Sequence, residues 1–250
     1  MTASNPQQQT FVAYKVWDLP VRLFHWIAVI SLLAMIASGI VMMFSSELGI
    51  SREHKVLLKA FHIWVGYVFV INLLIRLLWA FVGNRYARWL AILPFGKAYK
   101  AQWKAYLEAK KSGEQVYFLG HNPLGRWSVM AMLILMLGQG GTGLVLGSTD
   151  LFMPPFGNQM KTWIAESPES MALIKPGDRS TGISQQGWDE MREFRTPYRS
   201  LHTYLFYLLM LSIVVHIAAV VVAEKRERTG LTSAMITGHK YLPKKPFDAD

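Results

Sequence analysis

Four histidines lie inside long apolar stretches of this chain, where an imidazole is costly unless it has a partner or a task. They are His25, His62, His202 and His216. His202 and His216 are 14 residues apart. On one α-helix this spacing is nearly four turns, so the two side chains project about 40° apart around the axis and ~21 Å apart along it. A single interior histidine is commonly a hydrogen-bonded packing residue, but this spacing puts one imidazole near each surface of a bilayer.

Paired imidazoles at two depths are typical of two stacked haems. The chain contains no cysteine, which excludes thiolate-bound iron–sulfur clusters, Cys-type zinc sites and covalent haem attachment. The alternating direction of successive spans pairs His62 with His202 at the outer level and His25 with His216 at the inner level. Two axial imidazoles leave no open position on iron, which favours electron transfer over oxygen binding. We therefore expect these four residues to be the iron ligands of two b-type haems.

The elements that must position these histidines are four apolar stretches, each long enough to cross ~30 Å of hydrocarbon as a helix. Charged residues make up 17% of the chain, against about 25% in soluble proteins. The sequence predicts an all-α membrane protein, a four-transmembrane-helix bundle forming a di-haem domain over residues 21–223. The predicted spans are residues 21–44, 56–82, 127–146 and 201–223.

The formal net charge of +10 comes from Lys and Arg residues beside the spans. They gather in an N-terminal segment (1–20), in the connection 83–126 and in a C-terminal tail (224–250), which share one side of a four-span topology. By the positive-inside rule that side is the cytoplasm. We therefore expect cytoplasmic termini, a periplasmic loop over residues 147–200 and a location in a bacterial inner membrane. Topology explains the basic residues better than nucleic-acid binding does.

Two of the connections have further patterns. Residues 97–111 interleave basic and aromatic side chains, which predicts an amphipathic helix at the membrane interface; a solvated loop is an equal alternative, because periodicity over so few residues is weak evidence. Residues 147–200 contain several Pro and Gly residues and are expected to be irregular. The length of that loop suits a surface ordered by a partner protein.

Further candidate residues flank the histidines. Arg199 precedes His202 by three residues and, on the same helix face, is a candidate partner of a haem propionate. Several glycines lie at the levels of the histidines, where they either admit a flat porphyrin or serve ordinary helix packing. These glycines are Gly39, Gly66, Gly138, Gly140, Gly141 and Gly143.

Three motifs resemble the cytochrome b subunit of membrane-bound nickel–iron hydrogenases, a di-haem family shared with formate dehydrogenase gamma subunits. Ser38 stands where that family usually has Thr before Gly, and Thr203 stands where it usually has a basic residue; neither departure removes a histidine. The motifs are Arg22-Leu23-Phe24-His25-Trp26-Ile27 with a later Ser38-Gly39, then Gly120-His121-Asn122-Pro123-Leu124-Gly125, and Arg199-Ser200-Leu201-His202 followed by His216.

The resemblance implies a membrane-anchoring electron-transfer subunit of a respiratory chain, with no hydrogen-activating site of its own. It would accept electrons from the iron–sulfur small subunit of a periplasmic hydrogenase, whose large subunit holds nickel and iron. It would pass them by way of two b haems to quinone, with His121 and Asn122 as candidate quinone contacts near the inner haem.

Two alternatives remain open. One is the equivalent subunit of another periplasmic oxidoreductase, such as a formate dehydrogenase or a thiosulfate reductase. The other is a proton-coupled transporter that uses the histidines as a relay. A transporter of this kind usually recruits intramembrane carboxylates, and none of the four predicted spans contains Asp or Glu.

Overall fold

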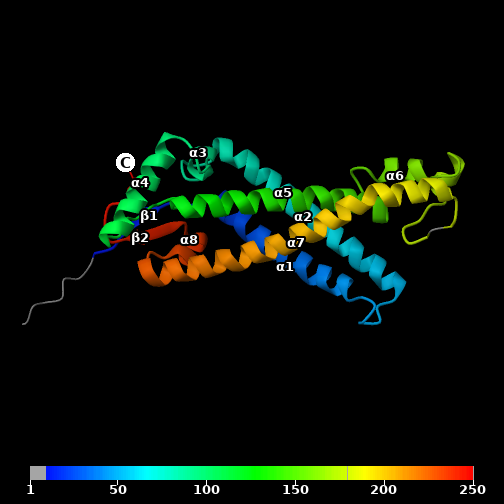
Figure 1. Ribbon diagram of the computed structural model, residues 1–250, viewed down its shortest axis with the longest axis horizontal. Coiled ribbons are helices and arrows are strands. Elements are labelled where there is room, and N and C mark those ends of the chain that lie inside the picture. The colour runs from blue at the N-terminus through cyan, green and yellow to red at the C-terminus, as the bar shows by residue number, and fades with distance from the viewer. Residues whose placement is uncertain (1–9, 179, 250) are drawn as a thin grey trace, which may run out of the picture. The chain divides into compact units, whose positions relative to one another are not determined.

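Four long helices dominate the computed structural model, which describes residues 10–178 and 180–249. Residues 1–9 of the predicted N-terminal segment and the last residue of the predicted tail lie outside the described residues. Within the described part, four helices are long and apolar enough to cross a membrane, as the sequence predicts. They are α1 (Leu19–Met43), α2 (Arg52–Val82), α5 (Pro123–Leu151) and α7 (Gln185–Glu227), labelled in Figure 1.

The helices begin where the sequence supplies side chains that cap them. At the start of α1, the Oδ1 atom of Asp18 accepts a hydrogen bond of 3.1 Å from the backbone N–H of Val21. At the start of α5, the Oδ1 atom of Asn122 accepts one of 2.7 Å from the N–H of Gly125. Each bond satisfies a backbone donor that has no partner within its helix. Pro123 occupies the first position of α5, where its missing N–H costs nothing.

Two of the helices run well beyond the predicted spans. Helix α5 continues to Leu151 and α7 already begins at Gln185, so both ends of the predicted loop 147–200 are helical. Hydropathy detects only the part of a helix that is apolar, whereas backbone hydrogen bonding continues into polar sequence. As a result Asp150 lies in the last turn of α5, although the predicted spans contain no carboxylate. Helix α7 even continues through Pro197.

The middle of the segment 147–200, expected to be irregular, is also ordered around a small apolar core. Helix α6 (Gly157–Ile164) and the 3-10 helix η1 (Glu169–Ala172) lie in this segment. The side chains that form the core are spaced too widely along the chain to show a period. They are Ile164, Ile174, Ile183 and Met191.

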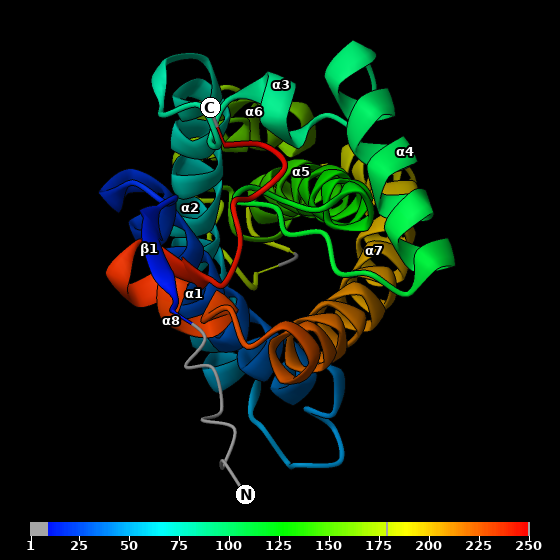
Figure 2. The same cartoon turned by 90° about the vertical axis from the view of Figure 1, so that its left-hand side faces the viewer.

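The remaining elements are short: α3 (Trp89–Ile92), α4 (Lys97–Ser112), α8 (Leu231–Thr237), β1 (Val12–Lys15) and β2 (His239–Leu242). Helix α4 confirms the helical interpretation of residues 97–111, and Gly113 in the left-handed conformation follows it. In Figure 2, α4 lies beside α5, and a hydrogen bond of 3.0 Å from Trp127 Nε1 to the Tyr99 hydroxyl joins the two helices.

The two strands join the segments that precede α1 and follow α7. They pair antiparallel, with Val12 opposite Leu242 and Lys15 opposite His239. A buried core lies beside them and includes a segment from the connection between α2 and α5. Its members are Val16, Trp17, Val21, Ala87, Tyr117, Leu119, Ala234 and Leu242.

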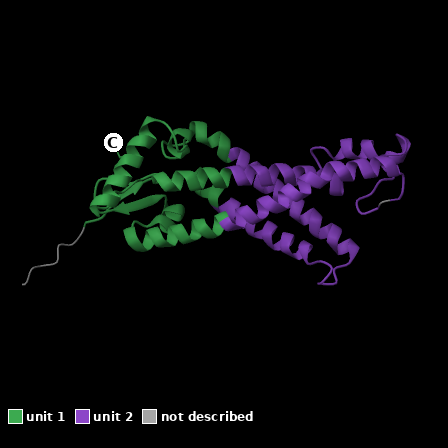
Figure 3. Cartoon of the chain, viewed as in Figure 1, with its two compact units in different colours: residues 1–25, 76–133, 212–250 green, residues 26–75, 134–211 purple. Residues whose placement is uncertain are grey.

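The chain divides into two compact units, coloured separately in Figure 3. Unit 1 comprises residues 1–25, 76–133 and 212–250, and unit 2 comprises residues 26–75 and 134–211. Each of the four long helices contributes residues to both units. His25 and His216 therefore belong to unit 1, and His62 and His202 belong to unit 2.

Large apolar side chains on the long helices are exposed. Ile30 and Leu78 are each 67% exposed and Leu211 is 61% exposed. In water, apolar surface of this extent would cost roughly 25 cal/mol per Å² and would drive association. Hydrocarbon removes that cost, so the exposed faces agree with a multi-pass membrane protein.

The junction between α8 and β2 is sensitive to a single methyl group. Gly238 has φ +84° and a Cβ atom there would lie 2.7 Å from the Trp17 carbonyl oxygen, whereas Gly113 has φ +75° with no atom within 4 Å of such a Cβ. Gly113→Ala is expected to cost about 1–2 kcal/mol, the penalty of the left-handed backbone alone. Gly238→Ala is expected to cost clearly more, because the strand pairing must also shift. Thermal unfolding in detergent, followed by circular dichroism, would measure both; equal losses would contradict the contact.

Candidate functional site

In unit 2, the rings of His62 and His202 face each other from α2 and α7. Their centroids lie 6.5 Å apart with the ring planes at 69°. Two metal–imidazole bonds of about 2 Å each, plus the distance from each nitrogen to its ring centre, give about 6 Å between the centres. The two rings are therefore spaced as an iron atom between them requires.

The hydroxyl groups beside these rings bear on which ring nitrogen is free. Ser38 Oγ lies 2.8 Å from the Ala34 carbonyl oxygen and 2.9 Å from His62 Nδ1. A hydroxyl has one hydrogen. In the tautomer protonated at Nδ1, Ser38 donates its hydrogen to Ala34, the His62 ring donates to Ser38, and Nε2 keeps its lone pair. That tautomer binds a metal through Nε2; the other tautomer reverses the bond between Ser38 and His62.

The second ring has the same arrangement on another helix. Thr142 Oγ1 donates to the Gly138 carbonyl oxygen over 2.7 Å and lies 2.9 Å from His202 Nδ1. In the same tautomer, His202 also keeps its lone pair on Nε2. Neither Ser38 nor Thr142 was singled out as a site residue from the sequence. The sequence does contain a pattern that could have identified them, because each hydroxyl residue is followed by a glycine.

Those two glycines lie against the imidazoles. A Cβ atom on Gly39 would lie 3.8 Å from His62 Cε1, and one on Gly143 would lie 3.4 Å from His202 Cε1. Other glycines of the same region serve helix packing instead. Gly138 lies against Leu205, Gly140 against Val70 and Gly66 against Met35.

One neighbour competes for the metal-binding nitrogen. Gln139 Nε2 lies 3.0 Å from His202 Nε2, so its amide N–H donates to the lone pair that iron would use. The Oε1 atom of Gln139 is buried and has no hydrogen-bond partner among the described residues. Turning this amide aside therefore breaks few bonds and would free the His202 nitrogen for a metal.

The other predicted pair lies in unit 1. His25 and His216 are half-buried, and an electrostatic interaction links them. Across residues 10–178 and 180–249, no three His, Asp or Glu side chains gather as ligands of a bare metal ion. Histidines that meet in pairs suit iron held by a porphyrin, which supplies four ligands of its own.

The two candidate quinone contacts have different surroundings. The carbonyl oxygen of the Asn122 side chain caps α5 and is therefore engaged. His121 packs against Trp17 with ring centroids 5.0 Å apart, and its Nδ1 atom is buried without a partner among the described residues. Burial, together with the nearby positive charges of Lys240 and two arginines, lowers the pKa of His121 to about 3. At neutral pH the ring is uncharged and able to donate one hydrogen bond and accept another.

Arg199, the candidate propionate partner, is exposed in the structure. One turn earlier in α7, Arg195 is partly buried and forms an ion pair of 2.6 Å with Asp150. The sequence analysis overlooked Arg195 because it lies outside the predicted span.

Comparison with known proteins gives a family match over most of the chain. The profile of the family described as prokaryotic cytochrome b561 matches residues 16–238. A probable Ni/Fe-hydrogenase 1 B-type cytochrome subunit of Escherichia coli strain K12 is 30% identical over 150 residues, covering 55% of this chain and 61% of that relative. The match thus spans less than two thirds of the relative's length.

Other relatives match over more of their length. Probable Ni/Fe-hydrogenase B-type cytochrome subunits of Azotobacter vinelandii and Rhodobacter capsulatus are 28% and 27% identical. The first match covers 61% of this chain and 67% of that relative, and the second covers 90% and 80%. No solved structure matches the chain at a significant level.

Near His121, the ammonium group of Lys240 makes stability depend on pH. Lys240 is 5% exposed and donates to the carbonyl oxygens of Phe118 and Gly120. Burial lowers its pKa from 10.5 to about 8, against the opposing effect of nearby carboxylates. Between these two values the unfolded chain holds a proton that the folded chain has lost. The free energy of unfolding is therefore expected to rise with pH through this window, by on the order of 3 kcal/mol.

Lys240→Met should abolish this rise, whereas Lys111→Met, on the exposed surface of α4, should leave it unchanged. Thermal unfolding of the three proteins between pH 7.5 and 10.5 would measure the difference. A rise of the same size in Lys240→Met would show that another group is responsible.

Proposed function

Since the chain belongs to the prokaryotic cytochrome b561 family, we propose that it is the membrane-anchoring cytochrome b subunit of a nickel–iron hydrogenase complex. In this role it receives electrons from the hydrogenase on the periplasmic side and delivers them, by way of two b haems, to quinone. It is an electron-transfer subunit of a hydrogen:quinone oxidoreductase, and hydrogen is activated elsewhere in the complex.

The observation that carries this proposal is the pair His62 and His202. With Nδ1 protonated, both rings present an Nε2 lone pair, and their centroids are 6.5 Å apart. The Nδ1–H of each ring is held by a hydroxyl group, which orients the ligand and raises its basicity. His62 and His202 would hold the haem iron through two imidazoles, an arrangement that favours electron transfer over oxygen binding.

His25 and His216 are the proposed ligands of the inner haem. Haem, when bound, supplies reversible one-electron chemistry. His25 and His216 would hold its iron, as His62 and His202 would at the other level, and Gly39 and Gly143 leave space beside the latter two imidazoles. His62 and His202 are the proposed ligands of the outer haem.

The strand pairing supports a topology with both termini in the cytoplasm. Because β1 precedes α1 and β2 follows α7, their pairing needs both segments on one side of the membrane. A segment of the connection 83–126 packs into the same core. These are the three basic regions that the positive-inside rule assigns to the cytoplasm, which leaves residues 147–200 in the periplasm of a bacterial inner-membrane protein.

The partner enzyme must hold the nickel and the iron–sulfur clusters, since this chain has no cysteine. The relatives named above as hydrogenase cytochrome subunits support a nickel–iron hydrogenase as that partner. The ordered segment between α5 and α7 exposes Phe156, Trp163 and Leu173, and aromatic side chains are enriched at protein interfaces. We assign this segment to contact with the small iron–sulfur subunit.

Quinone is proposed to bind near His121 in unit 1. This neutral ring lies within electrostatic range of His216 and can exchange hydrogen bonds with a quinone oxygen. The side-chain carbonyl oxygen of Asn122 caps α5 and is not free to contact the quinone. Asn122 is therefore proposed only to lie beside the quinone site.

A haem assay tests the proposal. The detergent-purified chain should show a b-type pyridine haemochrome spectrum with close to two haems per chain. His62→Ala and His202→Ala should each lose the same haem, so the double variant should lose no more than either. His25→Ala and His216→Ala should lose the other haem.

His54→Ala, which removes an exposed histidine at the start of α2, is the matched control and should keep both haems. A folded wild-type chain without haem would end the electron-transfer proposal. Co-purification with a nickel-containing protein would support the hydrogenase partner, and co-purification with a formate or thiosulfate enzyme would replace it.

A further inference from the structure

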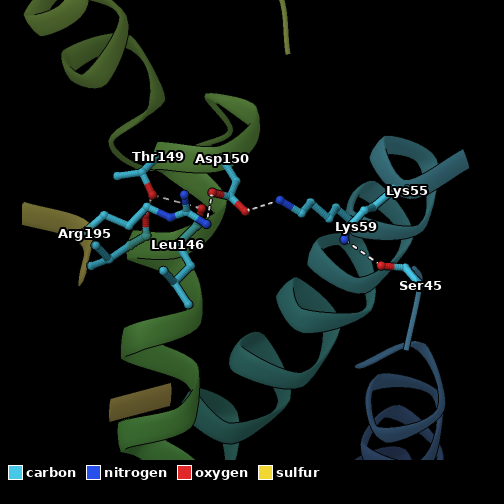
Figure 4. Close-up of polar contacts among 8 residues, drawn as sticks. Ser45, Lys55, Lys59, Leu146, Thr149, Asp150 and Arg195 are labelled. Atoms are coloured by element: carbon cyan, nitrogen blue, oxygen red, sulfur yellow. Dashed lines mark hydrogen bonds and ion pairs between the residues drawn. The ribbon is translucent and has the colours of Figure 1, made fainter. Parts of the chain in front are cut away.

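One carboxylate joins three of the long helices in unit 2. Asp150, in the last turn of α5, lies 2.6 Å from Lys59 Nζ of α2 and 2.6 Å from the guanidinium of Arg195 of α7. Figure 4 shows both cations pointing at the two oxygens of this carboxylate. A single negative charge therefore faces two positive ones.

The surroundings do not neutralise the excess. The three residues line a cavity of about 210 Å³ together with Arg52, Lys55 and Asp178. Arg52 donates to the Gly177 carbonyl oxygen, and Lys55 Nζ lies 2.5 Å from Ser45 Oγ, a neutral acceptor. Four cations line the cavity with two carboxylates. Arg52 is exposed to solvent and Lys55 interacts with Glu47, so the excess positive charge lies on Lys59 and Arg195, which share one carboxylate. A purely structural ion pair has no need of such an excess, since unpaired charge in a partly buried place is costly.

One donor in this cluster is also unused. The Nε atom of Arg195 is buried and has no acceptor among the described residues. Buried polar atoms of this kind are rare and call for a partner. A guanidinium carries five N–H donors in a planar fork that suits carboxylates, so Arg195 has the capacity to bind a second carboxylate beside Asp150.

The cluster lies to one side of the paired imidazoles. Lys59 precedes His62 by three residues on α2, and Arg195 precedes His202 by seven on α7. These spacings are about one and two helical turns, or roughly 4.5 and 10 Å along the axes. Both cations thus sit towards the same ends of their helices, within reach of groups attached to the edge of a macrocycle held between the rings.

We propose that Lys59 and Arg195 bind the two propionate carboxylates of the outer haem, and that Asp150 positions the two cations between them. The inference rests on the proposed function. Propionates carry the negative charge that Lys59 and Arg195, sharing one carboxylate, lack. Arg195 takes the role that the sequence analysis assigned to Arg199, which is exposed one turn further along α7.

The test compares haem with its dimethyl ester, which has the same iron and ring without the two carboxylates. The haem-free full chain in detergent, carrying His216→Ala to limit binding to the outer site, is titrated with each compound and followed by its Soret absorbance. Haem is expected to bind more tightly than the ester. Lys59→Gln and Arg195→Gln should weaken haem binding by roughly tenfold or more and leave binding of the ester nearly unchanged.

Arg199→Gln is the matched control and should keep the preference for haem over the ester. Asp150→Asn keeps a side chain of the same shape between the cations and removes a negative charge beside the propionates, so it should increase the preference for haem over the ester. If Lys59→Gln or Arg195→Gln fails to fold, Asp150→Asn still tests whether the cations bind the propionates. The ion pairs would be only structural if the chain with the cluster intact bound haem and the ester with equal affinity. Equal losses of affinity for both compounds in Lys59→Gln and Arg195→Gln would show the same. Failure of the His216→Ala chain to bind either compound would overturn the proposed function instead.

Discussion

Each hydroxyl beside the outer histidines has a single hydrogen, and its own helix already takes it. Ser38 donates to Ala34 and Thr142 donates to Gly138, and a hydroxyl that donates there cannot donate to the imidazole next to it. With the ring protonated at Nδ1, the imidazole donates to the hydroxyl and its second nitrogen keeps the lone pair. An ordinary feature of helices, the bond from Ser or Thr to the carbonyl four residues earlier, thus favours the tautomer in which His62 and His202 present Nε2 to a metal. The ligand role proposed for both rings depends on that bond.

The same arrangement occurs on two helices, α1 and α5, which both lack ligands at this level. Each supplies a hydroxyl residue followed by a glycine, and each glycine lies against the ring that its neighbour orients. Helices α2 and α7, which carry His62 and His202, are thereby flanked by helices that contact the rings through a hydroxyl and leave space beside them. At the edge of this arrangement, Asp150 ties α2, α5 and α7 together through Lys59 and Arg195.

Much of this could be predicted from the sequence. Length and hydropathy located the four spanning helices, because a helix in hydrocarbon must be apolar along about 20 residues. The 14-residue spacing of His202 and His216 predicted histidine pairs at two depths in the membrane. The structure does place His62 beside His202. The ligand assignments, the haem count and the orientation remain predictions.

The rest could not be predicted, for physical reasons that particular residues illustrate. Asp150 and Arg195 lie on helical extensions that are polar, so hydropathy ends before the helix does. Ile164, Ile174 and Ile183 meet through turns and short helices, and no periodicity announces such a core. Asn122 looks equally suited to binding a ligand and to capping a helix, and only the geometry of α5 distinguishes the two roles.

The pairing of β1 with β2 has a consequence for how the protein is made. A ribosome completes β1 before any of the four spanning helices and β2 only after the last of them. Strand β1 therefore waits unpaired while α1, α2, α5 and α7 enter the membrane one after another. The core around Trp17 can close only when the segment after α7 has been made, and the pairing then needs both strands on the same side of the membrane.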